Sequence, residues 1–305
     1  MRKINKIINI VLIFMLTGAV VCQGLYALRV PVDGHKTVEK ALTEWSPKKD
    51  LNGILLNKRT GRIKFRDIVK TSVVLDFVLW GVRHGETEAN KNKMMFQGNV
   101  DEEIDQLTDK GKEQAREAAE VLFAQLKDKI ASGEEIVVIT SDLKRAKDTA
   151  DAFISLVKER TGITIKPEVD KYANEISFGI WDNKTPEQLS SRDRYFIIQY
   201  RKNNATTRPK NGESFLDLLI RRKKLLETIN KSHKGKIVVL FSHGVGLTAD
   251  RVLLGDTALI DKTGQIDWKR KNMLPNGAAR LLYTPSTETF NPENIPSAVG
   301  NRNQI

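Results

Sequence analysis

The amino-acid sequence predicts an α/β fold, a three-layer sandwich in which a mainly parallel central sheet is flanked by helices. Two observations predict it. Continuous apolar runs rich in β-branched residues occupy 73–82, 136–140 and 237–241, a pattern typical of strands buried on both faces. Stretches with apolar residues at helical spacing lie between these runs. Strands that alternate with helices form a parallel sheet whose two faces the helices cover.

The elements follow in order along the chain. The strand at 73–82 leads to a helix that begins after Thr108, a favourable N-cap because its hydroxyl accepts a backbone N–H. The apolar stripe of this helix consists of Ala115, Ala118, Ala119, Leu122, Phe123 and Leu126. After the strand at 136–140, the next stripe consists of Leu143, Ala146, Ala150, Phe153, Ile154 and Val157. A third stripe precedes the strand at 237–241 and consists of Phe215, Leu218, Leu219, Leu225, Leu226 and Ile229.

The regions outside these elements differ in composition. Residues 29–70 are polar and weakly periodic, with a short hairpin predicted in 54–70 around Thr60-Gly61. From Pro285 the chain is rich in Pro, Asn, Ser and Thr, which predicts a disordered tail. The expected organisation is a signal peptide or membrane anchor at 1–27, an N-terminal extension at 28–72, the α/β domain at 73–285 and the tail at 286–305.

The N-terminal segment has the features of an export signal. Three basic residues among the first six precede an uncharged, mostly apolar stretch from Ile7 to Leu28, which is the arrangement of a signal peptide. Cleavage after Gly24 or Ala27 is expected to release the protein into the periplasm or the exterior. A retained segment of this length would instead anchor the protein in a membrane.

Cysteine usage excludes two classes of chemistry. The single cysteine, Cys22, lies within the N-terminal segment. Lipid attachment there is disfavoured because Val21 is a poor match to the small residue that such sites prefer. Loss of the segment leaves no thiol, which excludes a disulfide framework and cysteine catalysis in the mature chain.

The formal net charge of +12 suits an anionic partner. The basic residues are, however, interleaved with acidic ones on the predicted helices, and no basic stripe with stacking aromatic residues is visible. We therefore expect a small anionic substrate and no nucleic acid.

Each predicted strand ends in residues suited to an anion. The three ends read Arg83-His84-Gly85-Glu86-Thr87, Ser141-Asp142-Leu143-Lys144-Arg145 and Ser242-His243-Gly244. Because parallel strands end at one edge of the sheet, two histidines and two arginines are expected to converge there. Arginine binds phosphate oxygens in a forked geometry and keeps its charge. The glycine after each histidine lets the backbone approach a ligand closely.

These residues also have interpretations without function. His84 and His243 are each compatible with a hydrogen-bonded core histidine, and Arg145 with a charge on a helix surface. A zinc site on the two histidines lacks a third ligand at zinc-site spacing. Their joint placement at strand ends favours a functional site over a structural α/β domain.

The motifs together resemble the histidine phosphatase superfamily, also called phosphoglycerate mutase-like. They occur in the family's order over about two thirds of the chain, from 73 to 283. The matching segments are Arg83-His84-Gly85-Glu86-Thr87 with Asn90, Leu107-Thr108-Asp109-Lys110-Gly111 with Gln114-Ala115, Ser141-Asp142-Leu143-Lys144-Arg145-Ala146 with Thr149-Ala150, Asn174-Glu175-Ile176 with Phe178-Gly179 and Trp181, Asn211-Gly212-Glu213-Ser214, and Ser242-His243-Gly244.

The resemblance implies a role for each matching residue. His84 would be the nucleophile that forms a phosphohistidine, and Glu175 would protonate the leaving oxygen and then activate water. Arg83, Arg145 and His243 would bind the phosphoryl oxygens. The substrate-binding set would comprise Arg83, Asn90, Gln97, Gly98, Arg145 and His243. No metal and no cofactor is implied, and the expected partner is a small phosphorylated substrate.

The sequence departs from the family pattern at two places, of which the first concerns substrate recognition. The family often has an arginine just before a Gln-Gly pair, whereas Met95-Phe96 precede Gln97-Gly98 here. Either Lys93 takes its place or the cavity recognises substrate differently. Trp181-Asp182-Asn183 replaces the common Trp-Glu-Gly, which is expected to be a harmless loop change.

Hydrolysis is favoured over mutase-type phosphoryl transfer. The mutases carry a long proline-rich insert, whereas only Pro186 and Pro209 lie between Glu175 and Asn211. A catalytically inactive member that only binds phosphorylated ligands is a further alternative, although all the catalytic residue types are present. Substrate specificity is expected to depend on the loop after Asn90 and on 190–210, where Tyr195, Phe196, Tyr200 and Arg201 either line a pocket or pack.

Overall fold

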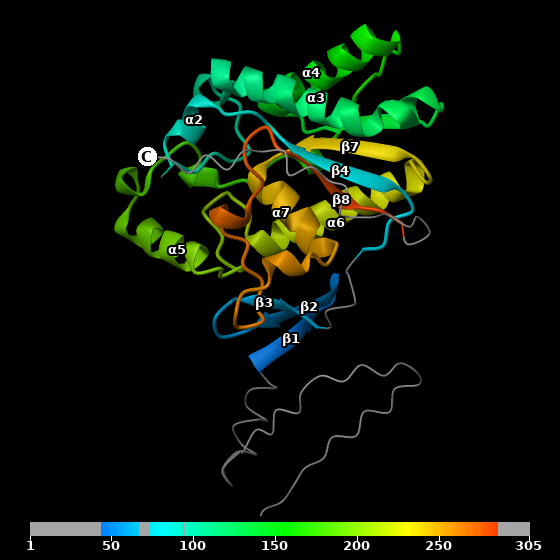
Figure 1. Ribbon diagram of the computed structural model, residues 1–305. Coiled ribbons are helices and arrows are strands. Elements are labelled where there is room, and N and C mark those ends of the chain that lie inside the picture. Colours follow the sequence, from blue (N-terminus) through cyan, green and yellow to red (C-terminus); the bar gives the residue numbers. More distant parts are fainter. Residues whose placement is uncertain (1–43, 67–72, 94, 286–305) are drawn as a thin grey trace, which may run out of the picture. The chain divides into compact units, whose positions relative to one another are not determined.

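The computed structural model describes residues 44–66, 73–93 and 95–285, which belong to one compact unit. At its centre is a five-stranded sheet with the order β6-β5-β7-β4-β8 (Figure 1). Its strands are β4 (Val78–Arg83), β5 (Ile136–Thr140), β6 (Glu168–Val169), β7 (Ile237–Ser242) and β8 (Ala279–Tyr283). β4 to β7 run parallel, and β8 pairs antiparallel with β4 at the edge. The predicted mainly parallel sheet is confirmed.

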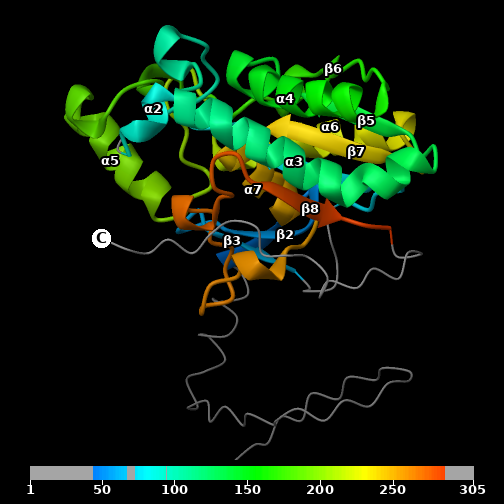
Figure 2. The same ribbon diagram turned by 45° about the horizontal axis from the view of Figure 1, so that its top comes forward.

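Helices cover both faces of this sheet, which gives the predicted three layers. One face carries α3 (Asp109–Ala131) and α4 (Lys144–Thr161), and the other carries α6 (Phe215–Ser232) and α7 (Gly244–Leu253) (Figures 1 and 2). The short α2 (Glu88–Lys91) and α5 (Ser191–Arg201) lie near the edge at which the parallel strands end. The 3-10 turns are η1 (Glu103–Asp105), η2 (Lys171–Ala173), η3 (Gly179–Trp181), η4 (Pro186–Gln188), η5 (Thr257–Leu259) and η6 (Arg270–Asn272).

Alternate residues of the central strands pack on opposite layers, as the two-residue repeat of a strand requires. In β4, Trp80 and Val82 join a buried cluster with α3 and α4. Leu79 joins a second cluster with α6 and α7. The sequence predicted burial on both faces correctly because apolar residues occupy both sets of alternate positions in β4, Leu79 on one face and Trp80 and Val82 on the other.

The first strand is shorter than the sequence predicts. β4 begins at Val78, whereas residues 73–77 form no ladder with the sheet. Val73, Leu75 and Phe77 are nevertheless buried, whereas Val74 is 69% exposed. The backbone of Asp76 bonds instead with the end of α6 and the turn after it: its N–H donates to Asn230 Oδ1 (2.6 Å), and its carbonyl accepts from Gly235 (2.7 Å). Apolarity alone therefore placed the strand five residues too early.

A second, three-stranded antiparallel sheet precedes the α/β region. It comprises β1 (Trp45–Lys48), β2 (Leu51–Asn57) and β3 (Ile63–Phe65), in the order β1-β2-β3. The hairpin predicted around Thr60-Gly61 is the β2–β3 turn. Leu51, Ile54 and Ile63 are buried in the same cluster as α6 and α7, so this part of the N-terminal extension is packed on the α/β core.

The strand register brings the predicted site residues to one level. Arg83 at the end of β4 lies opposite Ser242 at the end of β7, so His84 and His243 follow side by side. Thr140 of β5 lies opposite Phe241, and the N–H of Ser141 donates to the Phe241 carbonyl (3.0 Å). This is the edge at which parallel sheets place ligands.

A buried ion pair that the sequence did not suggest joins α6, α7 and β7. Arg222 and Asp250 are both fully buried, and two guanidinium nitrogens donate to the two carboxylate oxygens. Arg222 Nη1 also donates to Ser242 Oγ (3.2 Å), next to His243. Such a pair is strongly destabilising to break, because the remaining charge is left buried without a partner.

Candidate active site

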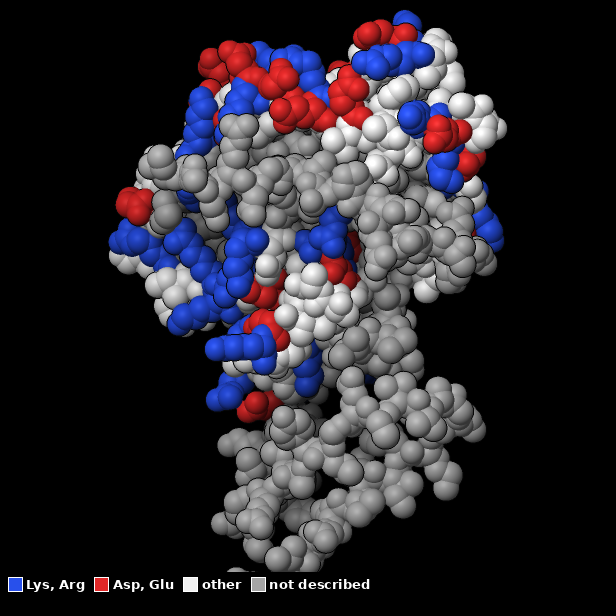
Figure 3. All heavy atoms as spheres, in the orientation of Figure 1, with Lys and Arg blue, Asp and Glu red and all other residues white. Residues whose placement is uncertain are grey.

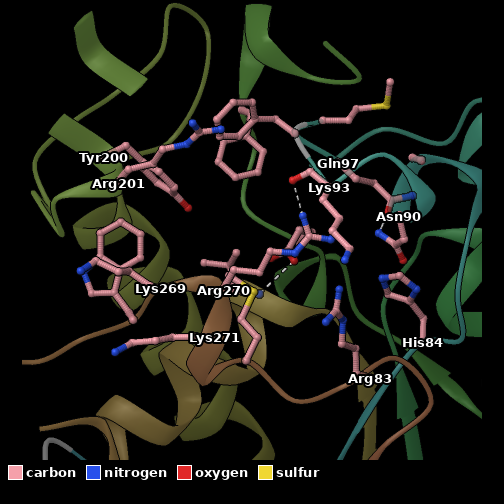
Figure 4. Close-up of a pocket in the computed structure, with 18 residues that line it drawn as sticks. Arg83, His84, Asn90, Lys93, Gln97, Tyr200, Arg201, Lys269, Arg270 and Lys271 are labelled. Atoms are coloured by element: carbon pink, nitrogen blue, oxygen red, sulfur yellow. Dashed lines mark hydrogen bonds between the residues drawn. The ribbon is translucent and has the colours of Figure 1, made fainter. Parts of the chain in front are cut away.

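A cavity of about 430 Å³ lies at the carboxyl ends of the parallel strands (Figure 4). Five of the eight residues predicted to be catalytic or substrate-binding line it: Arg83, His84, Asn90, Gln97 and Glu175. The other three, Gly98, Arg145 and His243, do not line it, and the latter two are fully buried.

His84 is held as a neutral ring with a free electron pair on one nitrogen. Its side chain lies at the end of β4, and the residue is only 2% exposed. Its Nδ1 lies 2.7 Å from the Gly85 carbonyl oxygen. A carbonyl only accepts, so Nδ1 carries the proton and Nε2 the lone pair. Burial, reinforced by Arg145 and Arg83, holds the pKa of His84 well below its usual range. The ring is therefore unprotonated at neutral pH and suited to nucleophilic attack.

Arg83 presents an incompletely bonded guanidinium beside His84. Its Nη1 donates to the Leu274 carbonyl (2.8 Å), but its Nε is buried and has no partner among the described residues. Burial lowers the pKa of Arg83 to about 10, against the attraction of Glu175, so it remains a cation at neutral pH. A buried donor without a partner is rare in folded proteins, so the Arg83 guanidinium keeps unused hydrogen-bonding capacity beside the cavity that it lines.

The glycines beside the two histidines serve packing more than ligand access. A Cβ on Gly85 would lie 2.1 Å from the Gly111 carbonyl oxygen in the first turn of α3. A Cβ on Gly244 would lie 3.2 Å from Arg83 Cζ. The missing side chains thus let α3 pack on the end of β4 and let the guanidinium of Arg83 lie against the start of α7.

His243 lies against His84, with ring centroids 5.1 Å apart. Its Nε2 is 2.8 Å from Ser141 Oγ, and that hydroxyl donates to Asn174 Oδ1 (2.8 Å). His243 Nε2 is therefore the donor to Ser141, which leaves the lone pair on Nδ1 in the neutral ring. Nδ1 has no partner among the described residues. Burial, with Arg145 and His84, holds the pKa of His243 well below its usual range.

Arg145 supplies charge from behind the histidines. Its Nη1 and Nη2 donate to the carbonyls of Val100 (2.8 Å) and Gly98 (2.7 Å). Its Nε is buried without a partner among the described residues. The resemblance implied that Arg145 binds the phosphoryl oxygens and that Gly98 binds substrate, whereas in this structure the Arg145 guanidinium donates to the Gly98 backbone carbonyl.

An amide network fixes Asn90 at the edge of the cavity. Asn90 Nδ2 donates to Gln97 Oε1 (2.7 Å), and Gln97 Nε2 donates to Asp105 Oδ1 (2.6 Å). Asn276 Nδ2 donates to Asn90 Oδ1 (2.8 Å) and to the His84 carbonyl (3.2 Å). Sequence reasoning missed Asn276, because no motif marks the segment before β8.

The carboxylate of Glu175 lies against the first turn of α7, and the residue lines the cavity. Its carboxylate accepts from the N–H groups of Val245 (3.0 Å) and Gly246 (2.9 Å) and from that of Ile176 (2.9 Å). The first turn of a helix offers such unsatisfied donors to an anion. These bonds hold the Glu175 side chain, which belongs to a loop, next to the residues that follow β7.

Arg221 holds the loop that carries Glu175. Its guanidinium pairs with Glu213 (2.8 Å) and donates to the backbone carbonyls of Tyr172 (2.8 Å), Asn174 (3.0 Å) and Glu175 (3.0 Å). A single side chain therefore fixes the path of the backbone on both sides of Asn174. Neither this role nor that of Glu213 was suggested by the sequence.

A second carboxylate in the same region has an unusual proton affinity. Burial raises the pKa of Asp182 to about 7, against hydrogen bonds from Phe178 and Gly179. Asp182 Oδ1 occupies the space where a Cβ of Gly98 would be, only 2.0 Å away. Asp182 does not line the cavity, so Glu175 is the better placed acid.

The outer wall of the cavity combines aromatic and basic side chains. Tyr200 and Arg201 line it, as does Lys93, whereas Tyr195 and Phe196 do not. The remaining basic residues come from the segment 254–278 between α7 and β8, which we call the C-terminal arm. Its contribution consists of Lys269, Arg270 and Lys271. Lys93, which the sequence offered in place of the missing arginine, thus lies in the cavity together with three basic residues from elsewhere in the chain.

Residues 44–66, 73–93 and 95–285 contain neither a metal-binding cluster nor a membrane-spanning helix. In that part of the chain no group of three or more His, Cys, Asp or Glu side chains could hold a metal ion. No helix within it is long and apolar enough to cross a membrane. The predicted signal peptide or anchor at 1–27 and the predicted tail at 286–305 lie outside the described residues.

Comparison with known proteins identifies relatives of this site. The sequence model of the histidine phosphatase superfamily (branch 1) matches residues 79–255, more than half of the chain. A mannitol-1-phosphatase of Eimeria tenella is 27% identical over 262 residues, 74% of this chain and 81% of that protein. A metal-independent phosphoserine phosphatase of Arabidopsis thaliana is 30% identical over 60% of this chain and 70% of its own length. The structure of a mycobacterial glucosyl-3-phosphoglycerate phosphatase with VO3 superposes with a TM-score of 0.50 and 28% identity, covering 67% of this chain and 90% of that one.

Proposed function

The chain belongs to the histidine phosphatase superfamily, and we propose that it hydrolyses small phosphomonoesters in two steps, with His84 carrying the phosphoryl group between them. It is a phosphatase, as its named relatives are. One observation carries the assignment of His84: the bond from Nδ1 to the Gly85 carbonyl leaves Nε2 as a lone pair beside the incompletely bonded Arg83 (Figure 4).

In the first step, Nε2 of His84 attacks phosphorus, and the bond from phosphorus to the ester oxygen breaks. Glu175 in its protonated form gives that oxygen a proton, so an alcohol leaves. In the second step a water molecule attacks the phosphohistidine and gives its proton to the Glu175 carboxylate. The P–N bond then breaks, which releases inorganic phosphate and restores the neutral His84.

Three cationic or protonated groups stabilise the transferred group. Arg83 donates from its guanidinium and Arg145 adds charge from behind. His243 can donate to the phosphoryl oxygens from Nδ1 only if that atom is protonated, because its Nε2–H is bound to Ser141. We propose that the dianionic phosphoryl group brings this proton into the site, since a nearby negative charge favours the cationic ring.

We expect phosphate release to require no metal ion. Arginines and histidines supply the positive charge that a metal would supply at the phosphoryl group, and the Arabidopsis relative is described as metal-independent. The measurement is phosphate release by the purified protein from a panel of phosphomonoesters, before and after dialysis against a strong chelator. The His84→Ala protein, prepared in parallel, reports contaminating phosphatases. A large loss on chelation that magnesium or zinc restores would contradict this part of the proposal.

We further propose that the protein is exported. Support comes from the basic start and the apolar stretch of 7–28 in the sequence. The mature N-terminus is expected at Leu25 or Leu28, and N-terminal sequencing of protein isolated from its own cells measures it. Full-length protein in the cytosol that begins at Met1 or Arg2 would refute the proposal, and full-length protein in the membrane fraction would show that the segment is an anchor.

A further inference from the structure

We infer that the outer half of the cavity is a second anion site, so that preferred substrates carry a carboxylate or another phosphate besides the phosphoryl group that is transferred. This inference rests on the proposed hydrolysis at His84. The site is formed by Arg270 of the C-terminal arm and by Lys93, which both line the cavity. Figure 4 shows their side chains on the side of Tyr200 that faces Arg83 and His84.

Arg270 and Lys93 form a pair of cations without a nearby acid. Arg270 Nη1 donates to the Lys93 backbone carbonyl (2.5 Å), which holds the two residues together. Among the described residues, no carboxylate oxygen lies within 4.0 Å of either side-chain cation. Lys269 and Lys271 differ, since both lie near Asp267, at 3.9 and 3.1 Å. Two neighbouring cations repel each other, and an anionic ligand between them relieves that repulsion.

The balance of charge in the cavity supports an anionic ligand group beyond the transferred phosphoryl. Glu175 is the only carboxylate among the described residues that line the cavity, and backbone N–H groups already bind both of its oxygens. On the surface, basic side chains gather over α5 and the C-terminal arm (Figure 3). Such a field attracts and concentrates an anionic substrate.

The C-terminal arm that carries Arg270 is firmly attached, which distinguishes it from a loose surface loop. Ile266 donates its N–H to the Ile63 carbonyl of β3 (2.9 Å), and Asp261 pairs with Arg62 (2.5 Å). Trp268 is buried and stacks on Phe215 of α6, with ring centroids 4.2 Å apart. The N-terminal sheet therefore stabilises the position of the C-terminal arm, which places Arg270 in the cavity.

Apolar side chains line another part of the cavity. Phe96, Phe178, Tyr200 and Trp268 line the cavity, and their rings contact one another edge to face or at a tilt. The carbon skeleton of a substrate would lie against these rings, with its phosphoryl group at His84 and its second anion at Arg270. A volume of about 430 Å³ accommodates a small organic phosphate of this kind.

The test compares substrates that differ only in the second anionic group. Glycerol 3-phosphate is paired with 3-phosphoglycerate, which adds a carboxylate, and fructose 6-phosphate with fructose 1,6-bisphosphate, which adds a phosphate. We expect the wild-type kcat/KM to favour the more anionic member of at least one pair by about 10-fold or more, and the pair that shows it identifies the preferred anion. Arg270→Gln should lower kcat/KM for that member by about 10- to 100-fold, as the loss of a charged hydrogen bond does. The kcat/KM of the paired substrate, which lacks the second anionic group, should change by no more than a few-fold.

Lys262→Gln is the matched control, because Lys262 is an exposed cation of the same arm that does not line the cavity. It should change neither substrate pair. Equal kcat/KM for both members of both pairs would overturn the inference. So would equal slowing of both members by Arg270→Gln, which would place Arg270 at the transferred phosphoryl group.

Binding to the His84→Ala protein separates this inference from the proposed function. Calorimetric titration with 3-phosphoglycerate and with glycerol 3-phosphate measures the second site without turnover. Tighter binding of 3-phosphoglycerate that Arg270→Gln abolishes would support the second site even if wild-type protein released no phosphate. Equal binding of these two ligands, together with equal binding of the two fructose phosphates, would overturn it even in an active phosphatase.

Discussion

Replacement of His84 by alanine is expected to lower kcat for every phosphomonoester by about 10,000-fold or more, the scale seen when an enzyme loses its nucleophile. Without the imidazole no P–N bond can form, and Arg83 and Arg145 can only bind the phosphoryl group. The measurement is steady-state phosphate release with p-nitrophenyl phosphate and with the best alkyl phosphate of the panel. Substrate binding should persist, because the arginines and the outer cations remain.

The chain offers a matched control for this substitution. His233 ends α6, pairs with Glu168 at 3.1 Å and does not line the cavity. His233→Ala should therefore retain most of the activity. A loss of less than about 10-fold in His84→Ala, in protein that remains folded by circular dichroism, would show that another group attacks phosphorus.

Replacement of Glu175 by glutamine is expected to slow the first step by about 100- to 10,000-fold for an alkyl phosphate, the range that a general acid supplies. An alkoxide is a poor leaving group and needs a proton, whereas nitrophenolate is stable without one. The first step with p-nitrophenyl phosphate should therefore be slowed far less. Single-turnover kinetics isolate that step, since hydrolysis of the phosphohistidine loses its base with both substrates and steady-state rates would hide the contrast.

Glu187→Gln is the control for this second prediction, because Glu187 is exposed on η4 and does not line the cavity. Equal slowing of the first step for both substrates by Glu175→Gln would mean that Glu175 only orients its neighbours. Asp182, whose pKa burial raises to about 7, would then be the next candidate acid. Glu213 is less suitable, since Arg221 binds both of its carboxylate oxygens.

The sequence predicted most reliably those features that depend on one strand or helix, or on the general geometry of parallel strands. The strands at 136–140 and 237–241 and the helix after Thr108 follow from local patterns of apolar residues and from one N-cap. The convergence of His84 and His243 follows from parallel strands ending at one edge. The start of β4 was placed wrongly at 73, because residues can be apolar through packing without pairing in a sheet.

The features that the sequence did not reveal depend on contacts between distant segments. β8 is a short, half-buried edge strand with few β-branched residues, so its sequence resembles a loop. Arg222 and Asp250 are 28 residues apart in sequence, and nothing local marks them as a buried pair. Arg270 and Lys93 are 177 residues apart. Their proximity depends on how the C-terminal arm packs on the N-terminal sheet.

The central claim is that the phosphoryl group is transferred to His84, and trapping that intermediate tests it most directly. Protein mixed with labelled substrate is quenched within milliseconds, and the modified residue is identified by mass spectrometry. We predict an acid-labile, base-stable phosphate on His84 that is absent in His84→Ala. With p-nitrophenyl phosphate it should accumulate in Glu175→Gln, whose second step lacks its base. Active enzyme that shows no phosphoprotein under these conditions, or a label that persists in His84→Ala, would contradict the account.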